Sequence, residues 1–173
     1  MQRRQDLKTD IMDIFDKNKN LVYRIALNYT KSIFDAEDIS QIVFMKLLEN
    51  MDRLEDGKEK AWLAKVTVNE CKNLLKSFWR KNVGSIEQEI AFETPEQSEI
   101  FNYIIKLQTK YRVVILLYYF EEYSTKEISE ILGISQSLVT TRLQRARKKL
   151  EPILKEEYHE NFIQRNHGTN QNV

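Results

Sequence analysis

Apolar residues recur at the three- and four-residue spacing of an α-helix in several segments of this 173-residue chain. In one segment near the C-terminal end, four of them fall within about 60° of one another when successive residues are placed 100° apart. These four residues are Val139, Leu143, Ala146 and Leu150. Only four Gly and two Pro interrupt the chain, which favours helices over a turn-rich β architecture. The pattern predicts an all-α protein.

A short helix and a turn precede this stripe. Ser124 and Glu127 have the spacing of a capping box, in which the two side chains satisfy backbone donors at a helix start. The helix that follows has on one face Ile128, Ile131 and Leu132. Gly133 then stands where a helix end favours a left-handed residue, and Ser135 can cap a second helix that starts at Gln136. A helix, a three-residue turn and a second helix have the spacing of a helix-turn-helix.

The polar face of the second helix carries hydroxyls, an amide and cations, and no acid occurs from Gly133 to Leu150. Such groups suit base edges and phosphates. A basic amphipathic helix on a solvated surface would show the same face, and the helix-turn-helix around it favours DNA binding over that alternative. The predicted DNA-binding residues are Gln136, Ser137, Leu138, Thr140, Thr141, Arg142, Gln144, Arg145 and Lys148.

An acidic segment divides the chain. Residues 82–98 contain Gly and Pro but no sustained helical periodicity, which predicts a flexible linker. It separates an N-terminal unit, residues 7–81, from a C-terminal unit, residues 99–158, and the Asn/Gln-rich residues 159–173 are predicted to be a disordered tail. The sequence therefore predicts two small helical domains. The apolar run 113–120 could be a buried strand by periodicity alone, but a helix-turn-helix needs helical scaffolding and no partner strand is apparent.

One helix of the N-terminal unit is predicted at residues 36–48, capped by Asp35. Its expected core stripe is Ile39, Ile42, Val43 and Leu47. The opposite face mixes acids, an amide and apolar side chains, which favours a protein partner, although a neighbouring helix could cover Phe44 and Leu48 instead. The predicted contact residues of such a partner are Glu37, Asp38, Gln41, Phe44, Met45 and Leu48.

The next predicted helix, residues 60–81, combines cations with amides and aromatic rings. Its apolar residues Leu63, Val66, Leu74 and Phe78 are expected to point inward, and a polar sector about 120° wide lies on the other side. Charge for the backbone and π faces for unstacked bases are what single-stranded DNA needs, although tryptophans in the core and merely solvated lysines remain the alternative. The predicted single-strand contacts are Trp62, Lys65, Asn69, Lys72, Asn73, Lys76 and Arg80.

These segments resemble the extracytoplasmic-function (ECF) sigma factors of bacterial RNA polymerase, a compact two-domain class of the sigma-70 family. Residues 123–150 are similar to region 4, which contacts the minus-thirty-five promoter element, and residues 35–47 to region 2.2, which docks on the clamp helices of the largest catalytic polymerase subunit. Residues 61–75 are similar to regions 2.3 and 2.4, which melt and contact the minus-ten element. There Asn69 matches an asparagine that contacts an extruded base.

The resemblance covers about residues 7–81 and 99–155, in the family's order of regions, with nothing in the place of the additional domains of larger sigma factors. It implies core RNA polymerase and promoter DNA as partners, and an anti-sigma factor that is commonly membrane-bound. Two pairs, Ser137-Leu138 and Thr140-Thr141, depart from the family's frequent residues at positions that face DNA. The promoter sequence, the inducing signal and the anti-sigma factor therefore do not follow from the chain.

Other classes have little support. The chain has one cysteine, Cys71, and two distant histidines, His159 and His167. It has no Gly-rich phosphate loop and no plausible triad, so the sequence predicts neither an enzyme nor a metal or cofactor site. The longest apolar run is far short of a membrane span and the N-terminus has no signal-peptide pattern, so we expect a cytoplasmic protein without membrane insertion. A dimeric stand-alone regulator and an adaptor for acidic partners remain as rivals.

Overall fold

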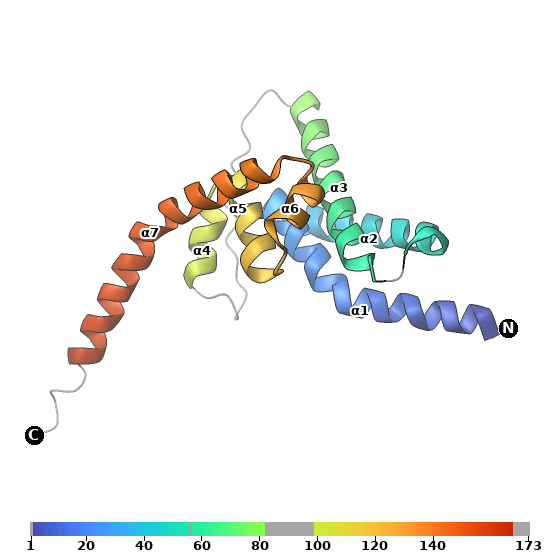
Figure 1. The fold of residues 1–173 in the computed structure, drawn as a ribbon, viewed down its shortest axis with the longest axis horizontal. Coiled ribbons are helices and arrows are strands. Elements are labelled where there is room, and N and C mark those ends of the chain that lie inside the picture. Colours follow the sequence, from blue (N-terminus) through green and yellow to red (C-terminus); the bar gives the residue numbers. More distant parts are fainter. Residues whose placement is uncertain (1, 56, 82–98, 168–173) are drawn as a thin grey trace, which may run out of the picture.

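The computed structural model describes residues 2–55, 57–81 and 99–167, and all its regular elements there are helical (Figure 1). The elements in chain order are α1 (Gln2–Thr30), α2 (Ile33–Asn50), the 3-10 turn η1 (Met51–Arg53), α3 (Glu59–Lys81), α4 (Glu99–Lys106), α5 (Thr109–Ile115), the π-helical turn η2 (Leu116–Phe120), α6 (Thr125–Leu132) and α7 (Gln136–His167). The all-α prediction is confirmed for this part of the chain. The predicted linker lies outside it.

The N-terminal unit is formed by α1, α2 and α3. Its core consists of Val22, Ala26, Leu27, Ala36, Ile39, Val43, Leu47, Leu63 and Cys71. Helix α2 begins one turn earlier than predicted, because the Ser32 hydroxyl accepts the hydrogen bond from the Asp35 backbone N–H at 3.2 Å. Ser32 is therefore the cap, and Asp35 lies in the first turn, where a carboxylate favours the helix dipole. Ile42 was expected in the core stripe, and it is 42% exposed.

The C-terminal unit packs α4, α5, η2 and α6 against the first half of α7. The apolar run 113–120 is helical, as predicted, and five of its residues are buried: Val113, Val114, Ile115, Leu116 and Leu117. The run ends in a π turn, in which the Glu121 N–H donates to the Leu116 carbonyl at 3.1 Å. Helix α7 continues to His167, past residue 158, where the sequence predicted this unit to end.

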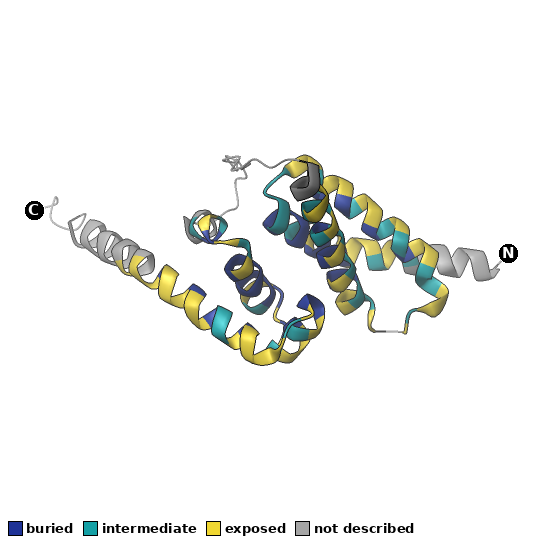
Figure 2. Cartoon of the chain, turned by 90° about the horizontal axis from the view of Figure 1, so that it is seen from above, coloured by how far each residue is buried: buried dark blue, intermediate teal, exposed yellow. Residues whose placement is uncertain are grey.

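A second hydrophobic cluster, separate from the core of the N-terminal unit, spans both units. Leu21 and Ile25 of α1 and Ala64 and Val68 of α3 belong to the same buried cluster as the apolar residues of the C-terminal unit. Figure 1 shows α1 and α7 projecting in opposite directions from this centre, and Figure 2 shows mostly exposed residues along the part of α7 whose burial is described. The units therefore pack directly against each other.

Candidate nucleic-acid interface

The helix-turn-helix is held by local polar contacts. The Ser124 hydroxyl accepts from the Glu127 N–H at 3.3 Å, and the Glu127 carboxylate accepts from the Ser124 N–H at 2.8 Å, which completes the predicted capping box. Gly133 has the left-handed φ of +66°. The Ser135 hydroxyl accepts from the Leu138 N–H at 3.3 Å, so Ser135 caps α7 as predicted. These contacts fix the angle at which α7 leaves the turn.

Helix α7 has a buried and an exposed face. The predicted core residues Val139, Leu143, Ala146 and Leu150 are all buried. Of the predicted DNA-binding residues, two are half-buried, Thr141 and Arg142. The exposed ones are Gln136, Ser137, Leu138, Thr140, Gln144, Arg145 and Lys148. Figure 2 draws most of this stretch of α7 in the colour of exposed residues, and because no acid occurs from Gly133 to Leu150 the exposed face is positive.

Helix α3 exposes a second polar face. Four predicted residues recur along it at helical spacing and are exposed: Lys65, Asn69, Asn73 and Lys76. Trp62 and Lys72 are half-buried, and the Lys72 ammonium donates to the Leu132 carbonyl at 2.7 Å. The side chain of Arg80 lies outside the described residues. The exposed cations and amides follow one side of α3, which is the geometry that a single strand needs.

Helix α2 has a mixed outer face. Five of the six residues predicted for a protein partner are exposed: Glu37, Asp38, Gln41, Met45 and Leu48. Phe44 is half-buried because its ring packs edge-on against Phe15 of α1, with the centroids 4.6 Å apart. Sequence reasoning missed Phe34, whose side chain is 79% exposed in the first turn of α2. Its spacing of four, seven and eleven residues from Asp38, Gln41 and Met45 is the signal that could have found it.

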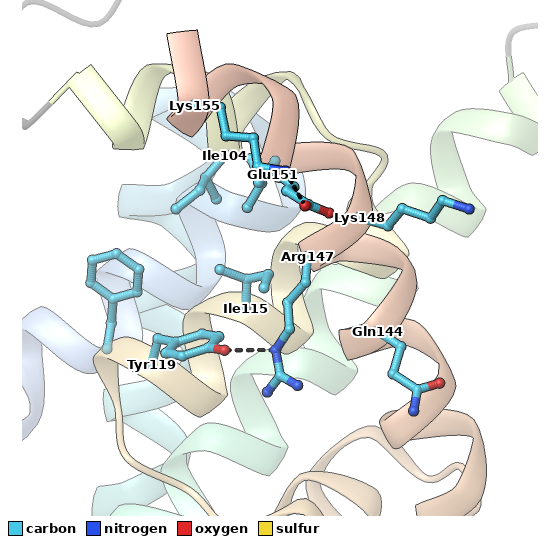
Figure 3. A pocket seen from close by; sticks show the side chains of 10 residues that line it. Ile104, Ile115, Tyr119, Gln144, Arg147, Lys148, Glu151 and Lys155 are labelled. Atoms are coloured by element: carbon cyan, nitrogen blue, oxygen red, sulfur yellow. Dashed lines mark hydrogen bonds and ion pairs between the residues drawn. The ribbon is translucent and has the colours of Figure 1, made fainter. Parts of the chain in front are cut away.

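Sequence reasoning also missed a groove on the C-terminal unit, which Figure 3 shows from close by. It has a volume of about 880 Å³ and is mostly apolar, with Arg147 and Lys148 at its rim. The Arg147 guanidinium donates to the Tyr119 hydroxyl at 2.7 Å, and Lys155 pairs with Glu151 at 2.7 Å. The apolar lining residues are Ile104, Ile115, Tyr119, Phe120 and Leu150. A groove of this kind suits the apolar face of another helix.

Within the described ranges, no cluster of His, Cys, Asp and Glu is placed to hold a metal ion, and no helix is long and apolar enough to cross a bilayer. Burial raises the pKa of the Cys71 thiol to about 12, so at neutral pH it is not a thiolate nucleophile.

Family comparisons match both units. The sigma-70 region 2 model matches residues 14–81 and the sigma-70 region 4 model matches residues 97–150. The ECF RNA polymerase sigma factor SigM of Bacillus subtilis is 30% identical over 83% of this chain and 94% of its own length. The chain belongs to the ECF sigma factors. SigW of the same organism is 28% identical over 88% of this chain and 91% of its own length.

Solved structures show the same fold. The sigma factor RpoE of Bartonella quintana, in complex with the anti-sigma factor NepR, has a TM-score of 0.73 at 23% identity over 87% of this chain and 98% of its own. CnrH, in complex with the cytosolic domain of CnrY, has a TM-score of 0.61 at 20% identity over 86% and 90% of the two chains. Because both family models and the similar sigma factors SigM and SigW match the chain, this ECF sigma factor directs RNA polymerase to promoters in transcription initiation.

Proposed function

We propose that this sigma factor uses three surfaces: α7 for the minus-thirty-five element, α3 for the melted minus-ten element, and α2 for the core polymerase. The observation that carries the proposal is the exposure of an acid-free, cation-rich face on α7 beside a family match to sigma-70 region 4. The units assigned to these tasks are residues 7–81 and 99–158, with residues 82–98 as the connection.

For α7, the exposed amide and cation side chains match donors that contact base edges and phosphates in the major groove. Arg145→Ala should therefore lower promoter binding by the holoenzyme about 10-fold, because one base or phosphate contact contributes about 1–3 kcal/mol. Lys149→Ala is the matched control, since it removes an exposed cation of α7 outside the proposed set. Equal losses of promoter binding in the two variants would mean that α7 contacts DNA only as a non-specific basic surface.

For α3, Asn69 is exposed between Lys65 and Asn73 and is placed to hydrogen-bond an unstacked base. Asn69→Ala should leave binding to closed duplex promoter nearly unchanged and lower the fraction of open complex about 5- to 30-fold, the equivalent of about 1–2 kcal/mol. Permanganate footprinting of unpaired thymines measures that fraction. Ser77→Ala, an exposed position on the same helix, is the control, and an unaffected open complex in Asn69→Ala would contradict the assignment.

For α2, the proposed polymerase surface extends to Phe34. Phe34, Asp38, Gln41, Met45 and Leu48 fall within a sector about 80° wide, so a partner that covers Met45 can also cover the Phe34 ring. Exposed aromatic rings at the centre of an interface often dominate its affinity.

Removing that ring tests the extension. Phe34→Ser should weaken core-polymerase binding about 10-fold without loss of thermal stability, as a buried aromatic contact of about 1.4 kcal/mol requires. Met12→Ser, which changes an exposed apolar side chain on α1, should bind like the unchanged chain. If Met45→Ser weakens binding and Phe34→Ser does not, the surface ends before Phe34.

An anti-sigma factor is the further partner that we propose, because the related RpoE and CnrH were solved in complexes with NepR and CnrY. We also propose that the chain acts in the cytoplasm, without catalysis of its own and without a cofactor. The decisive experiment is in vitro transcription with core polymerase over a genomic template. The expected result is a set of start sites that require this chain, and their absence would refute the proposal.

A further inference from the structure

The threonine hydroxyls near the start of α7 are bonded to the helix itself. The Thr140 hydroxyl donates to the Gln136 carbonyl at 3.1 Å, and the Thr141 hydroxyl donates to the Ser137 carbonyl at 2.9 Å. Both bonds join residues four apart, so they are internal to the helix and do not depend on what α7 contacts. A hydroxyl has one proton to donate, and here that proton is in use. Neither threonine therefore offers a hydrogen-bond donor to a base.

The other polar side chains of this first turn also have partners within the helix-turn-helix. The hydroxyl of Ser135, which caps α7, lies 3.1 Å from the Ser137 hydroxyl, so the two share a hydrogen bond. The Gln136 amide donates to the Thr125 hydroxyl of α6 at 2.8 Å. The first cation of α7 is Arg142. The polar groups that precede it are therefore largely engaged before any DNA is bound.

Apolar groups remain at this part of the surface of α7. Leu138 is 39% exposed, although it is a large apolar side chain. Thr140 is exposed and Thr141 is half-buried, and each carries a methyl group on the Cβ that bears its bonded hydroxyl. At 100° per residue, the three side chains lie in a sector about 160° wide opposite the buried stripe. We call these three residues, Leu138, Thr140 and Thr141, the methyl face.

One base presents a matching apolar group in the major groove. Thymine has a C5 methyl beside its O4 acceptor, whereas cytosine has an N4 amino donor and no methyl. A threonine methyl packs on the thymine methyl, and a leucine side chain makes the same kind of apolar contact. Against cytosine, these side chains would cover the amino donor without accepting from it, and a covered donor without a partner costs free energy. The methyl face therefore fits thymine and disfavours cytosine.

We propose that the methyl face contacts the 5-methyl groups of thymines in the minus-thirty-five element, and that these contacts select part of the promoter sequence. Cations farther along α7, such as Arg145, then contact phosphates and base acceptors. The inference deepens the proposed function and rests on it, because α7 must lie in the major groove of that element. It assigns a chemistry to the positions at which this chain departs from the family's frequent residues.

Deoxyuridine tests the contact, because it lacks the thymine methyl and keeps the O4 acceptor. A promoter found by transcription over the genomic template is prepared with each thymine of its minus-thirty-five element, on either strand, replaced in turn by deoxyuridine. We expect the affinity of the holoenzyme to fall about 4-fold at each thymine that the methyl face contacts, which is the effect of burying one methyl-sized group. Thymines between the two promoter elements are the control and should show no change.

Variants of the chain identify the group that contacts each methyl. Thr140→Ser removes the threonine methyl and keeps the hydroxyl that bonds to the helix, whereas Thr140→Val keeps a methyl and removes the hydroxyl. At the thymine that this residue contacts, Thr140→Ser should bind thymine and deoxyuridine alike, and Thr140→Val should keep the difference of about 4-fold. Thr141→Ser and Thr141→Val make the same comparison, and Leu138→Ala tests the third residue. Thr125→Ser, which removes a threonine methyl of α6 outside the methyl face, is the matched control and should keep every deoxyuridine effect.

Three results would overturn the role of the methyl face. They are a minus-thirty-five element without thymine on either strand, equal affinity for the thymine and deoxyuridine promoters, and deoxyuridine effects that persist in Thr140→Ser, Thr141→Ser and Leu138→Ala alike.

Failure of this inference is distinguishable from failure of the proposed function. Start sites that require the chain, together with equal affinities for the two promoters, refute the methyl face alone. If no start site requires the chain, the proposed function is refuted, and duplexes that the full chain selects from a random pool then serve for the same comparison. A loss of about 4-fold with deoxyuridine in those duplexes would support the methyl face by itself.

Discussion

Replacing Arg112 by Met should cost more stability than any other single loss of a cation in the described chain. The side chain is 1% exposed, and its described hydrogen bonds go to neutral oxygens. Burial lowers the pKa of Arg112 to about 10, so the guanidinium is still protonated at neutral pH. It donates to the carbonyls of Asn28, Ile105 and Leu107 at 2.6, 3.0 and 2.7 Å.

The position of those carbonyls sets the magnitude. They lie at or just past the C-terminal ends of α1 and α4, where the last carbonyls lack partners within the helix and carry the negative end of its dipole. Leaving buried carbonyls unsatisfied costs about 1–3 kcal/mol each, and part of that is offset because a buried charge is removed. We therefore expect Arg112→Met to lower the free energy of unfolding by about 3–5 kcal/mol.

Urea unfolding followed by far-ultraviolet circular dichroism measures this loss. The loss of unfolding free energy in Arg112→Lys should lie between zero and the loss in Arg112→Met, because an ammonium is a point donor and does not reproduce the planar fork of the guanidinium. Arg147→Met is the control: Arg147 is exposed and binds Tyr119, so its loss should cost less than about 1 kcal/mol. A cost below about 1 kcal/mol for Arg112→Met would refute the capping role.

Three further predictions concern the helix-turn-helix. Gly133→Ala should lower the free energy of unfolding by about 1–2 kcal/mol, because an added Cβ meets no atom within 4 Å and only the positive φ opposes it. Thermal unfolding tests this, and an unchanged melting temperature would contradict it. Leu143→Ala should lower the free energy of unfolding in urea by about 2–5 kcal/mol, since the side chain is 2% exposed. A loss below about 1 kcal/mol would mean that the core readily collapses around the site. Hydrogen bonds from Ser124 hold the pKa of Glu127 below its usual 4.5, so its contribution to stability is present above pH 4.5 and is lost as pH falls through the lower folded value. Glu127→Gln should remove this loss of stability below pH 4.5, which acid unfolding of the two proteins measures.

The helix-turn-helix was predictable because its determinants are local. The capping box joins residues three apart, the left-handed turn needs one glycine, and the core stripe repeats within one helix. Each of these is visible in the sequence around Ser124 and Gly133, and the structure confirms them. The exposure of the predicted α7 and α3 residues follows from the same periodicity.

The contacts between the two units were not predictable, because the paired residues are far apart in sequence. Arg24 and Glu121 are 97 residues apart, and Arg112 and Asn28 are 84 apart, so no periodicity connects them. Helix α1 was not delineated either, although Leu21 and Ile25 have helical spacing. On α3, the sequence predicted one inward face and one polar face. Val68 belongs to neither predicted set, and it is buried against the C-terminal unit. Where two units cover one helix, a single hydrophobic face does not determine its orientation.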